Sequence, residues 1–202
     1  VEDLEELLGK APFDHTKKQP KPQVGVVTGL AWTQFGGDIL PIEVNHFKGS
    51  GKFIVTGQLG DVMKESASIA LDYLKAHADK YNLKDIDFDK QDIHIHVPEG
   101  AVKKDGPSAG VTLTTAIYSA FTQKPVRDDV AMTGEVTLTG NVLPIGGLKE
   151  KSISAHRSGI HTIIIPKDNA KDIDDIPESV RKDLTIITAD HIDTVLENAL
   201  VK

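Results

Sequence analysis

A serine near the middle of the chain stands in a turn that contains glycine and proline. Residues 104–110 read KDGPSAG, with Ser108 just before a helix-like run. A serine hydroxyl attacks a carbonyl well only when a base removes its proton and donors stabilise the oxyanion. The first N–H groups of a helix are free and carry the positive end of its dipole. A serine at this place therefore has half of what acyl transfer needs, and the rest of the chain must supply the base.

A lysine is one candidate for this base. Lysine acts as a base only when neutral, so it must be buried or lie near another cation. Residues 146–152 read GGLKEKS, and at about 100° per residue Lys151 shares one helix side with Leu148, Ser152 and Ala155. Lys149 points elsewhere. The pattern predicts that Lys151 is enclosed, although surface exposure, which is usual for a helical lysine, stays open. The preceding glycines allow close backbone approach.

A histidine is the alternative base. Residues 106–110 match the G-x-S-x-G nucleophile elbow, and Asp168 or Asp172 with His191 could complete a triad. However, an elbow serine directly follows a strand, whereas here the apolar run ends at Val97 and charged residues intervene. His191 also opens a polar helix. The context therefore favours lysine over this triad.

Two further segments carry candidate side chains. Residues 132–135 read MTGE, in which Thr133 could bond a lysine amine beside the Glu135 carboxylate; both also suit ordinary strand positions. Trp32 either packs in the core or lines a substrate groove near Gly36 and Gly37.

Composition narrows the class of protein. The chain has 202 residues, 39% of them hydrophobic, a net charge of −7 and no cysteine. The hydrophobic content is sufficient for a packed core. The lack of cysteine excludes a disulfide framework and a thiolate zinc site. The acidic balance disfavours sequence-independent nucleic-acid binding. The first residues are acidic, unlike a secretory signal, and the apolar runs are too short to span a membrane. His94 and His96 share one strand side without an evident third ligand, so no metal is expected.

The chain divides into two parts. Residues 1–22 hold a short helix and a polar linker, which predicts a remnant of a preceding domain, and residues 23–202 form one domain. Strand-like runs near residues 24–32, 39–44 and 52–56 predict an early β-meander. Later strands, including one over 130–138, alternate with helices, which indicates an α+β class rather than a doubly wound sheet.

Several long motifs in the same order resemble the proteolytic domain of Lon, the ATP-dependent serine protease. The resemblance runs from about Gln23 to the end of the chain and rests most strongly on residues 104–110, 132–135 and 142–151. Residues 28–38, 93–100 and 164–169 add to it.

The resemblance implies a serine endopeptidase with a Ser–Lys dyad. Ser108 corresponds to the nucleophile and Lys151 to the base. Backbone N–H groups around Ser108, with Gly106 or Ala109, would form the oxyanion hole. Thr133 would orient the amine, while Glu135 and Asp105 would support the site or gate its loop. The implied fold is like the second domain of ribosomal protein S5, and the implied assembly is a homohexameric ring.

The resemblance also implies what lies outside this chain. Residues 49–52, GSGK, resemble part of a Walker A loop, but Phe53 replaces the required Ser or Thr, so a hairpin turn is expected. ATP and magnesium would belong to a missing ATPase module, and this chain would need no cofactor. Substrates would be unfolded, damaged or regulatory proteins in the bacterial cytoplasm rather than the mitochondrial matrix; DNA binding occurs in the family but is not indicated here.

Two other functions remain open. The chain could be chiefly an assembly domain that is inactive without its ATPase ring. It could instead be a nucleic-acid-binding module like ribosomal protein S5, which the net charge of −7 disfavours.

Overall fold

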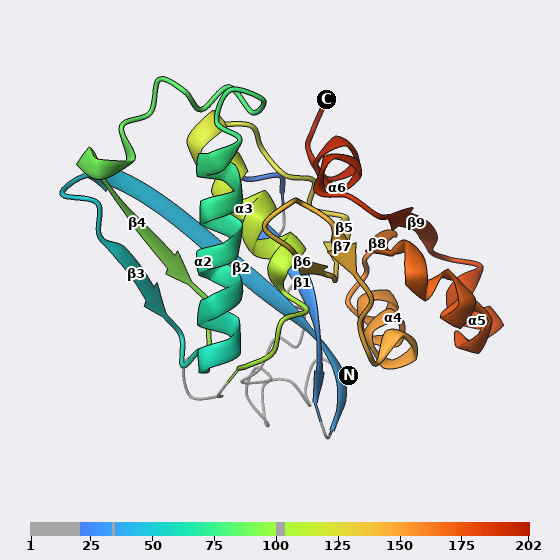
Figure 1. Ribbon diagram of the computed structural model, residues 1–202. Helices are drawn as coiled ribbons and strands as arrows, with labels where there is room; N and C mark the ends of the chain where they lie inside the picture. Colours follow the sequence, from blue (N-terminus) through green and yellow to red (C-terminus); the bar gives the residue numbers. More distant parts are fainter. Residues whose placement is uncertain (1–20, 34, 100–103) are drawn as a thin grey trace, which may run out of the picture.

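A seven-stranded mixed sheet forms the centre of the molecule, with helices on both of its faces (Figure 1). The computed structural model describes residues 21–33, 35–99 and 104–202, so the helix and most of the linker expected over 1–22 lie outside the described residues. The strands of this sheet follow the order β3-β4-β2-β1-β5-β8-β9. They are β1 (Val26–Thr33), β2 (Gly36–Lys48), β3 (Phe53–Thr56), β4 (Gln91–His96), β5 (Val130–Met132), β8 (Thr162–Pro166) and β9 (Thr185–Ala189).

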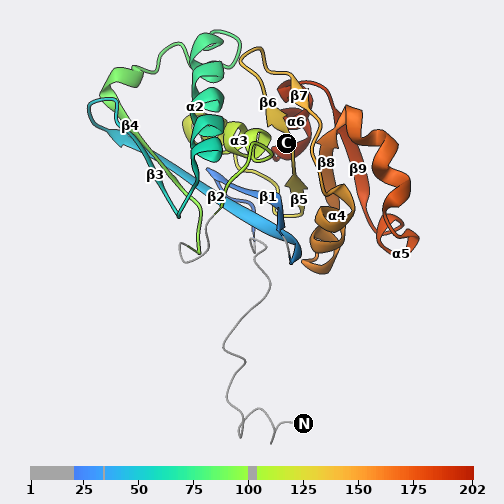
Figure 2. The ribbon, with the colours of Figure 1, turned by 60° about the horizontal axis from the view of Figure 1, so that its bottom comes forward.

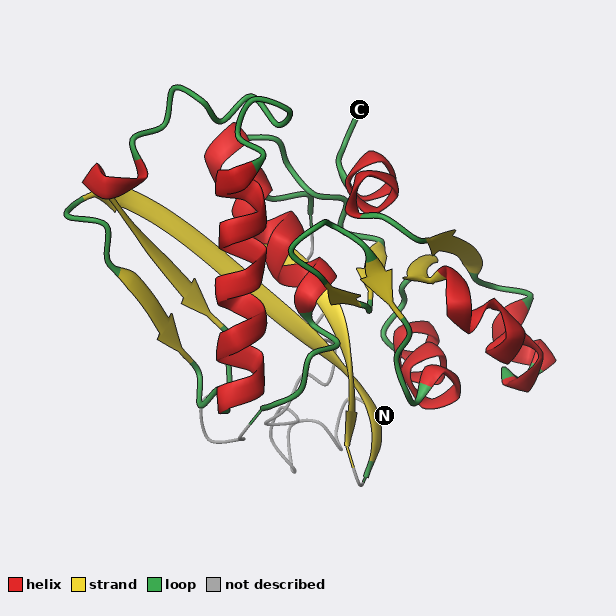
Figure 3. Cartoon of the chain, viewed as in Figure 1, coloured by secondary structure: helices red, strands yellow, loops and turns green. Residues whose placement is uncertain are grey.

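Most helices lie in the connections between these strands, and the last helix follows β9 (Figure 3). The α-helices are α2 (Asp61–Ala76), α3 (Gly110–Thr122), α4 (Leu148–Arg157), α5 (Glu178–Arg181) and α6 (Ile192–Ala199), and the 3-10 helices are η1 (Phe88–Lys90) and η2 (Lys167–Asp175). This mixture of helices and a largely parallel sheet confirms a fold of mixed α and β type.

Alternating side chains along the strands build two apolar cores. On β5, Met132 joins the core that α2 and α3 cover, whereas Ala131 joins the core beneath α4. On β8, Ile164 joins the core under α2 and α3, and Ile165 joins the core beneath α4. Successive strand residues point to opposite faces, so a fully apolar strand needs cover on both sides. Figure 2 shows α2 and α3 on one side of the sheet and α4 on the other.

The expected β-meander is wrong in its third strand. β1 and β2 form an antiparallel hairpin, with Trp32 opposite Gly37. However, β4 pairs with the far edge of β2, and β3 joins β4 in parallel. The connection from β3 to β4 passes through α2, and such a crossover places its two strands parallel.

The turn between β2 and β3 is held by β4 rather than by a ligand. The N–H groups of Ser50 and Lys52 both donate to the Asp92 carboxylate at 2.9 Å. These backbone hydrogen bonds, first from Lys52 and then from Ser50, hold the pKa of Asp92 below its ordinary value. A carboxylate of the chain itself thus occupies the N–H groups that a phosphate-binding loop would offer to its ligand.

The strand expected over 130–138 is divided. β5 ends at Met132, and β6 (Glu135–Val136) pairs with β7 (Val142–Leu143) in a separate two-stranded sheet. The break arises because the Gly134 N–H donates to the Ser108 carbonyl at 2.8 Å instead of continuing the ladder. β5 pairs with β1 only at Thr28 and Gly29, so the last residues of β1 extend past the end of β5.

Candidate active site

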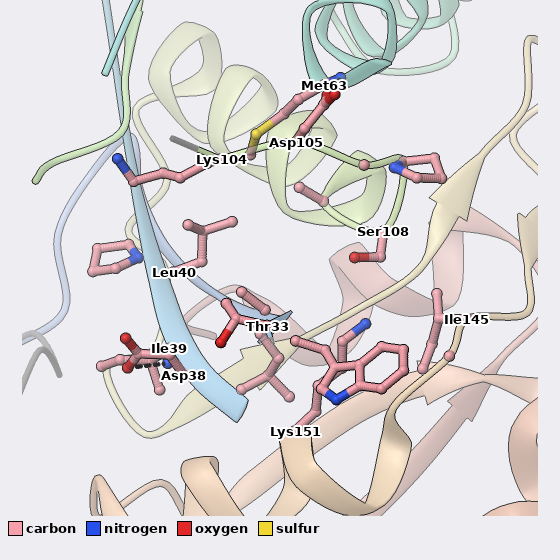
Figure 4. A pocket seen from close by; sticks show the side chains of 18 of the residues that line it. Thr33, Asp38, Ile39, Leu40, Met63, Lys104, Asp105, Ser108, Ile145 and Lys151 are labelled. Carbon is pink, nitrogen blue, oxygen red and sulfur yellow. Dashed lines mark hydrogen bonds between the residues drawn. The ribbon is translucent and has the colours of Figure 1, made fainter. Parts of the chain in front are cut away.

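A cavity of about 650 Å³ opens at this end of the sheet, and both Ser108 and Lys151 line it. Figure 4 shows their side chains entering the cavity from different sides. Its remaining lining comes from the end of β1, the start of β2, the start of α2, the residues after β4, the turn before α3 and the segment before α4. Its apolar lining residues include Leu30, Trp32, Ile39, Leu40, Pro41, Met63, Pro144 and Ile145.

The turn that carries Ser108 is fixed by the residues that follow β5. The Ser108 carbonyl accepts a hydrogen bond from Gly134 N at 2.8 Å and a longer one from Thr133 Oγ1 at 3.5 Å. Val111 N, in the first turn of α3, donates back to the Gly134 carbonyl at 3.0 Å. The serine, two residues before α3, is therefore held between the helix and the broken end of β5.

Backbone donors lie beside the serine hydroxyl. Ser108 and Ala109 both line the cavity, and their N–H groups make no hydrogen bond within the described part of the chain. The N–H group of Gly110, by contrast, is used by the Pro107 carbonyl at 3.2 Å. Two available N–H groups next to a serine hydroxyl are what an oxyanion hole requires.

Lys151 is the buried lysine that the helical pattern predicts. It is 2% exposed, and its Nζ donates to Thr133 Oγ1 at 3.0 Å. Among the described residues no carboxylate forms an ion pair with it. Burial therefore lowers its pKa to about 8. A substantial fraction of this amine is neutral at mildly alkaline pH, which is the form that can accept a proton.

The expected helix side is confirmed for α4. Leu148, Ser152 and Ala155 are buried with Lys151, whereas Lys149 is exposed. The hydrogen bond also places Thr133 between the lysine amine and the Ser108 carbonyl, so one threonine connects both candidate residues.

Two glycines allow α4 to lie against the β1–β2 hairpin. Gly37 packs on the Glu150 carbonyl so closely that no Cβ would fit. Gly147, with φ of +73°, precedes the helix, and a Cβ there would lie 2.6 Å from the Trp32 ring. The hairpin thus sets the position of the helix that carries Lys151.

The other predicted site residues divide into those on the cavity and those away from it. Trp32 is 59% exposed and lines the cavity, so the core interpretation of this residue is wrong. Gly106 and Asp105 also line it, and Asp105 Oδ1 accepts a hydrogen bond from Met63 N at 2.9 Å at the start of α2. The residues absent from the cavity lining are Gly36, Gly37, Glu135 and Thr133, and Thr133 reaches the site through its hydrogen bond with Lys151 Nζ.

Several lining residues were not predicted from the sequence. Leu40 and Met63 come from β2 and α2, and their apolar types give no sign that they border a cavity rather than the core. Ile145 also lines the cavity, and its place directly before Gly146 and Gly147 is the one sequence signal that it lies near the site.

The histidine alternatives lie elsewhere. His191 accepts from Asp193 N at the start of α6, and its other nitrogen contacts the Thr139 carbonyl at 3.3 Å. His94 and His96 both contact Thr56 Oγ1. Within residues 21–33, 35–99 and 104–202, no group of three or more His, Cys, Asp or Glu side chains could hold a metal ion. No helix there is long and apolar enough to cross a membrane.

The sequence of this chain matches known proteins over its whole length. The model of the Lon protease (S16) C-terminal proteolytic domain matches residues 1–202. The chain belongs to this family. It is 59% identical over 199 residues to Lon protease of Brevibacillus choshinensis. The aligned residues cover 98% of this chain and 26% of that protein.

Two further relatives give the same result. Lon protease of Mycoplasma mycoides is 60% identical over 192 residues, 95% of this chain and 24% of that protein. Lon protease 1 of Bacillus subtilis is 57% identical over 199 residues, 98% of this chain and 26% of that protein. This Lon proteolytic domain thus spans about a quarter of the length of the relatives it matches.

Proposed function

We propose that this Lon proteolytic domain is a serine endopeptidase in which Ser108 is the nucleophile and Lys151 the general base. The supporting observation is the buried Lys151 amine on the cavity that Ser108 also lines, with its pKa lowered to about 8. A serine with a lysine base needs this combination, because an ordinary lysine is protonated at neutral pH.

The proposed reaction has two stages. Lys151 Nζ takes the proton of Ser108 Oγ while Oγ bonds to the scissile carbonyl carbon, and the N–H groups of Ser108 and Ala109 stabilise the oxyanion. The tetrahedral intermediate then releases the amine, which receives the proton from Lys151. Water next attacks the acyl carbon while Lys151 accepts its proton. The bond from Ser108 Oγ to that carbon then breaks, Oγ takes the proton back from Lys151, and the carboxylic acid product leaves. Thr133 orients the lysine amine throughout.

The substrate is an extended polypeptide with apolar side chains. Leu30, Ala31, Trp32 and Thr33 all line the cavity, on a part of β1 that extends past the end of β5. An extended peptide can therefore pair with this backbone edge and place an apolar side chain against Leu40 and Met63.

The intact protein would supply what this domain does not. We propose that it is an ATP-dependent protease of unfolded or damaged proteins, with ATP and magnesium bound by an ATPase module, in a hexameric ring. We also propose that the mixed sheet belongs to the fold of the second domain of ribosomal protein S5. Both proposals rest on family membership.

The test is hydrolysis of a fluorogenic peptide by this chain as a function of pH. Activity should rise with pH through about 8 as Lys151 loses its proton. Ser108→Ala and Lys151→Ala should each lose at least about a thousandfold in kcat, in line with the cost of removing a nucleophile or its base. Lys149→Ala, on the same helix but exposed, should keep activity within about threefold. Full activity in either dyad variant, or none in the intact chain, would contradict the proposal; the latter would favour a domain that needs its ATPase ring.

A further inference from the structure

A buried asparagine outside the cavity binds the backbone of one of its walls. Asn169 lies in η2 and is 3% exposed. Its Oδ1 accepts a hydrogen bond from Ile145 N at 2.8 Å, and its Nδ2 donates to Ile145 O at 2.9 Å. One side chain thus satisfies both backbone groups of a residue 24 positions earlier, as a neighbouring strand would.

The orientation of this amide is itself fixed. Asn169 Nδ2 also donates to Asp172 Oδ2 at 2.9 Å. The nitrogen side therefore faces two acceptors, Ile145 O and the carboxylate, while the oxygen side faces a donor. Only one orientation of the amide satisfies all three partners, so Asp172 holds Asn169 and Asn169 holds Ile145.

The backbone held in this way belongs to the cavity. Pro144, Ile145 and Gly146 line it, and we name these three residues the wall segment. The wall segment has no regular structure of its own, since it lies between the end of β7 at Leu143 and the start of α4 at Leu148. Its position therefore depends on side-chain anchors, and Asn169 supplies the two hydrogen bonds at its centre.

We infer that Asn169 is a positioning residue that sets the substrate selectivity of the cavity by holding the wall segment. The inference rests on the proposed peptidase function. Lys151 is held separately by its hydrogen bond to Thr133 and by the packing of α4 on Gly37. Loss of the Asn169 amide should therefore change which side chains fit the cavity, without changing the pKa of the lysine.

The test uses a set of fluorogenic peptides that vary at four positions, two before and two after the cleaved bond. At each position in turn, a peptide with Leu is compared with the same peptide with Ala. At one position the wild type should prefer Leu, and Asn169→Ala should lose roughly tenfold in that preference, the usual scale for one apolar pocket contact. The loss should appear in KM, with kcat and the pH midpoint unchanged. Asp172→Asn should shift the preference in the same direction by less.

Asn198→Ala is the matched control. This asparagine is half-buried on α6, and its Nδ2 donates to the Thr194 carbonyl at 2.8 Å, away from the cavity. Its variant should keep the selectivity of the wild type even where stability falls. Unchanged selectivity at all positions in both Asn169→Ala and Asp172→Asn, while Ser108→Ala is inactive, would overturn the inference alone. Absence of cleavage by the wild type, or cleavage by Ser108→Ala, would overturn the proposed function and the inference with it.

Discussion

Two polar clusters in this domain shift the pKa of a lysine in opposite directions. In the cavity, Lys151 bonds the neutral hydroxyl of Thr133 and no carboxylate among the described residues, and burial lowers its pKa to about 8. Near the start of α6, Lys80 donates to the Asp193 carboxylate at 2.5 Å, and this hydrogen bond raises its pKa. The lysines differ in burial and in partner. Lys151 is 2% exposed and has a hydroxyl beside its ammonium, whereas Lys80 is exposed and bonds a carboxylate that stabilises the ammonium.

The second cluster also contains two tyrosines, whose hydroxyl groups are hydrogen-bonded. Tyr81 Oη donates to Asp193 Oδ1 at 2.6 Å, and the hydroxyl groups of Tyr73 and Tyr81 contact each other. Burial, with the hydrogen bond to Asp193, raises the pKa of Tyr81. Each group there is kept in its ordinary state near neutral pH, as suits a contact that joins the segment after α2 to α6. A site that must exchange a proton needs the opposite arrangement.

The largest expected effect is on the free energy of unfolding, which the buried Lys151 lowers. A charged lysine is disfavoured in the fold below its folded pKa of about 8, and this cost disappears as pH rises past its unfolded pKa of about 10.4. Lys151→Met should therefore raise the free energy of unfolding at pH 7 by up to about 3 kcal/mol. The gain should shrink towards pH 10. Urea unfolding at both pH values measures it, and equal stability of variant and wild type at pH 7 would argue against a desolvated lysine.

A smaller effect is expected from the partner of the lysine. Thr133→Val removes the hydroxyl that bonds Lys151 Nζ and should lower kcat by about tenfold to a hundredfold, because the amine loses its orientation. Thr133→Ser keeps the hydroxyl and should restore most of the activity. The pH midpoint should fall in the valine variant, since the ammonium form loses an acceptor. A valine variant with wild-type kcat would show that Thr133 has no positioning role.

The smallest effect is expected in the second cluster. Burial raises the pKa of Asp193, but hydrogen bonds from Lys80 and Tyr81 outweigh it, and the net pKa is below the ordinary value. Asp193→Asn should therefore lower stability at pH 7 by about 1 kcal/mol, and the difference should vanish as pH falls through the folded pKa. Peptidase activity should stay within about threefold. Unfolding curves at pH 7 and pH 3 test the stability, and a large loss of activity would link this cluster to the active site.

Local patterns sufficed for several elements of the fold. The spacing of residues 148–155 predicts the buried side of α4, because a helix repeats every 3.6 residues whatever lies against it. The turn around Ser108 and the start of α3 follow in the same way from its glycine and proline. The prediction of a β-meander was wrong because local patterns do not decide whether β3 pairs with β2 or with β4. That pairing depends on the crossover through α2 and on the Asp92 carboxylate.

The sequence by itself therefore determined the family, the candidate site residues Ser108 and Lys151 and the helix side on which Lys151 lies. Only the tertiary structure decided that Thr133 joins the lysine amine to the Ser108 carbonyl, that Trp32 lines a cavity, and that Asn169 holds the wall segment. Spacing along the chain fixes the direction of a side chain within one element. Burial and hydrogen-bond partners, which set pKa and position, depend on residues brought together from distant parts of the chain.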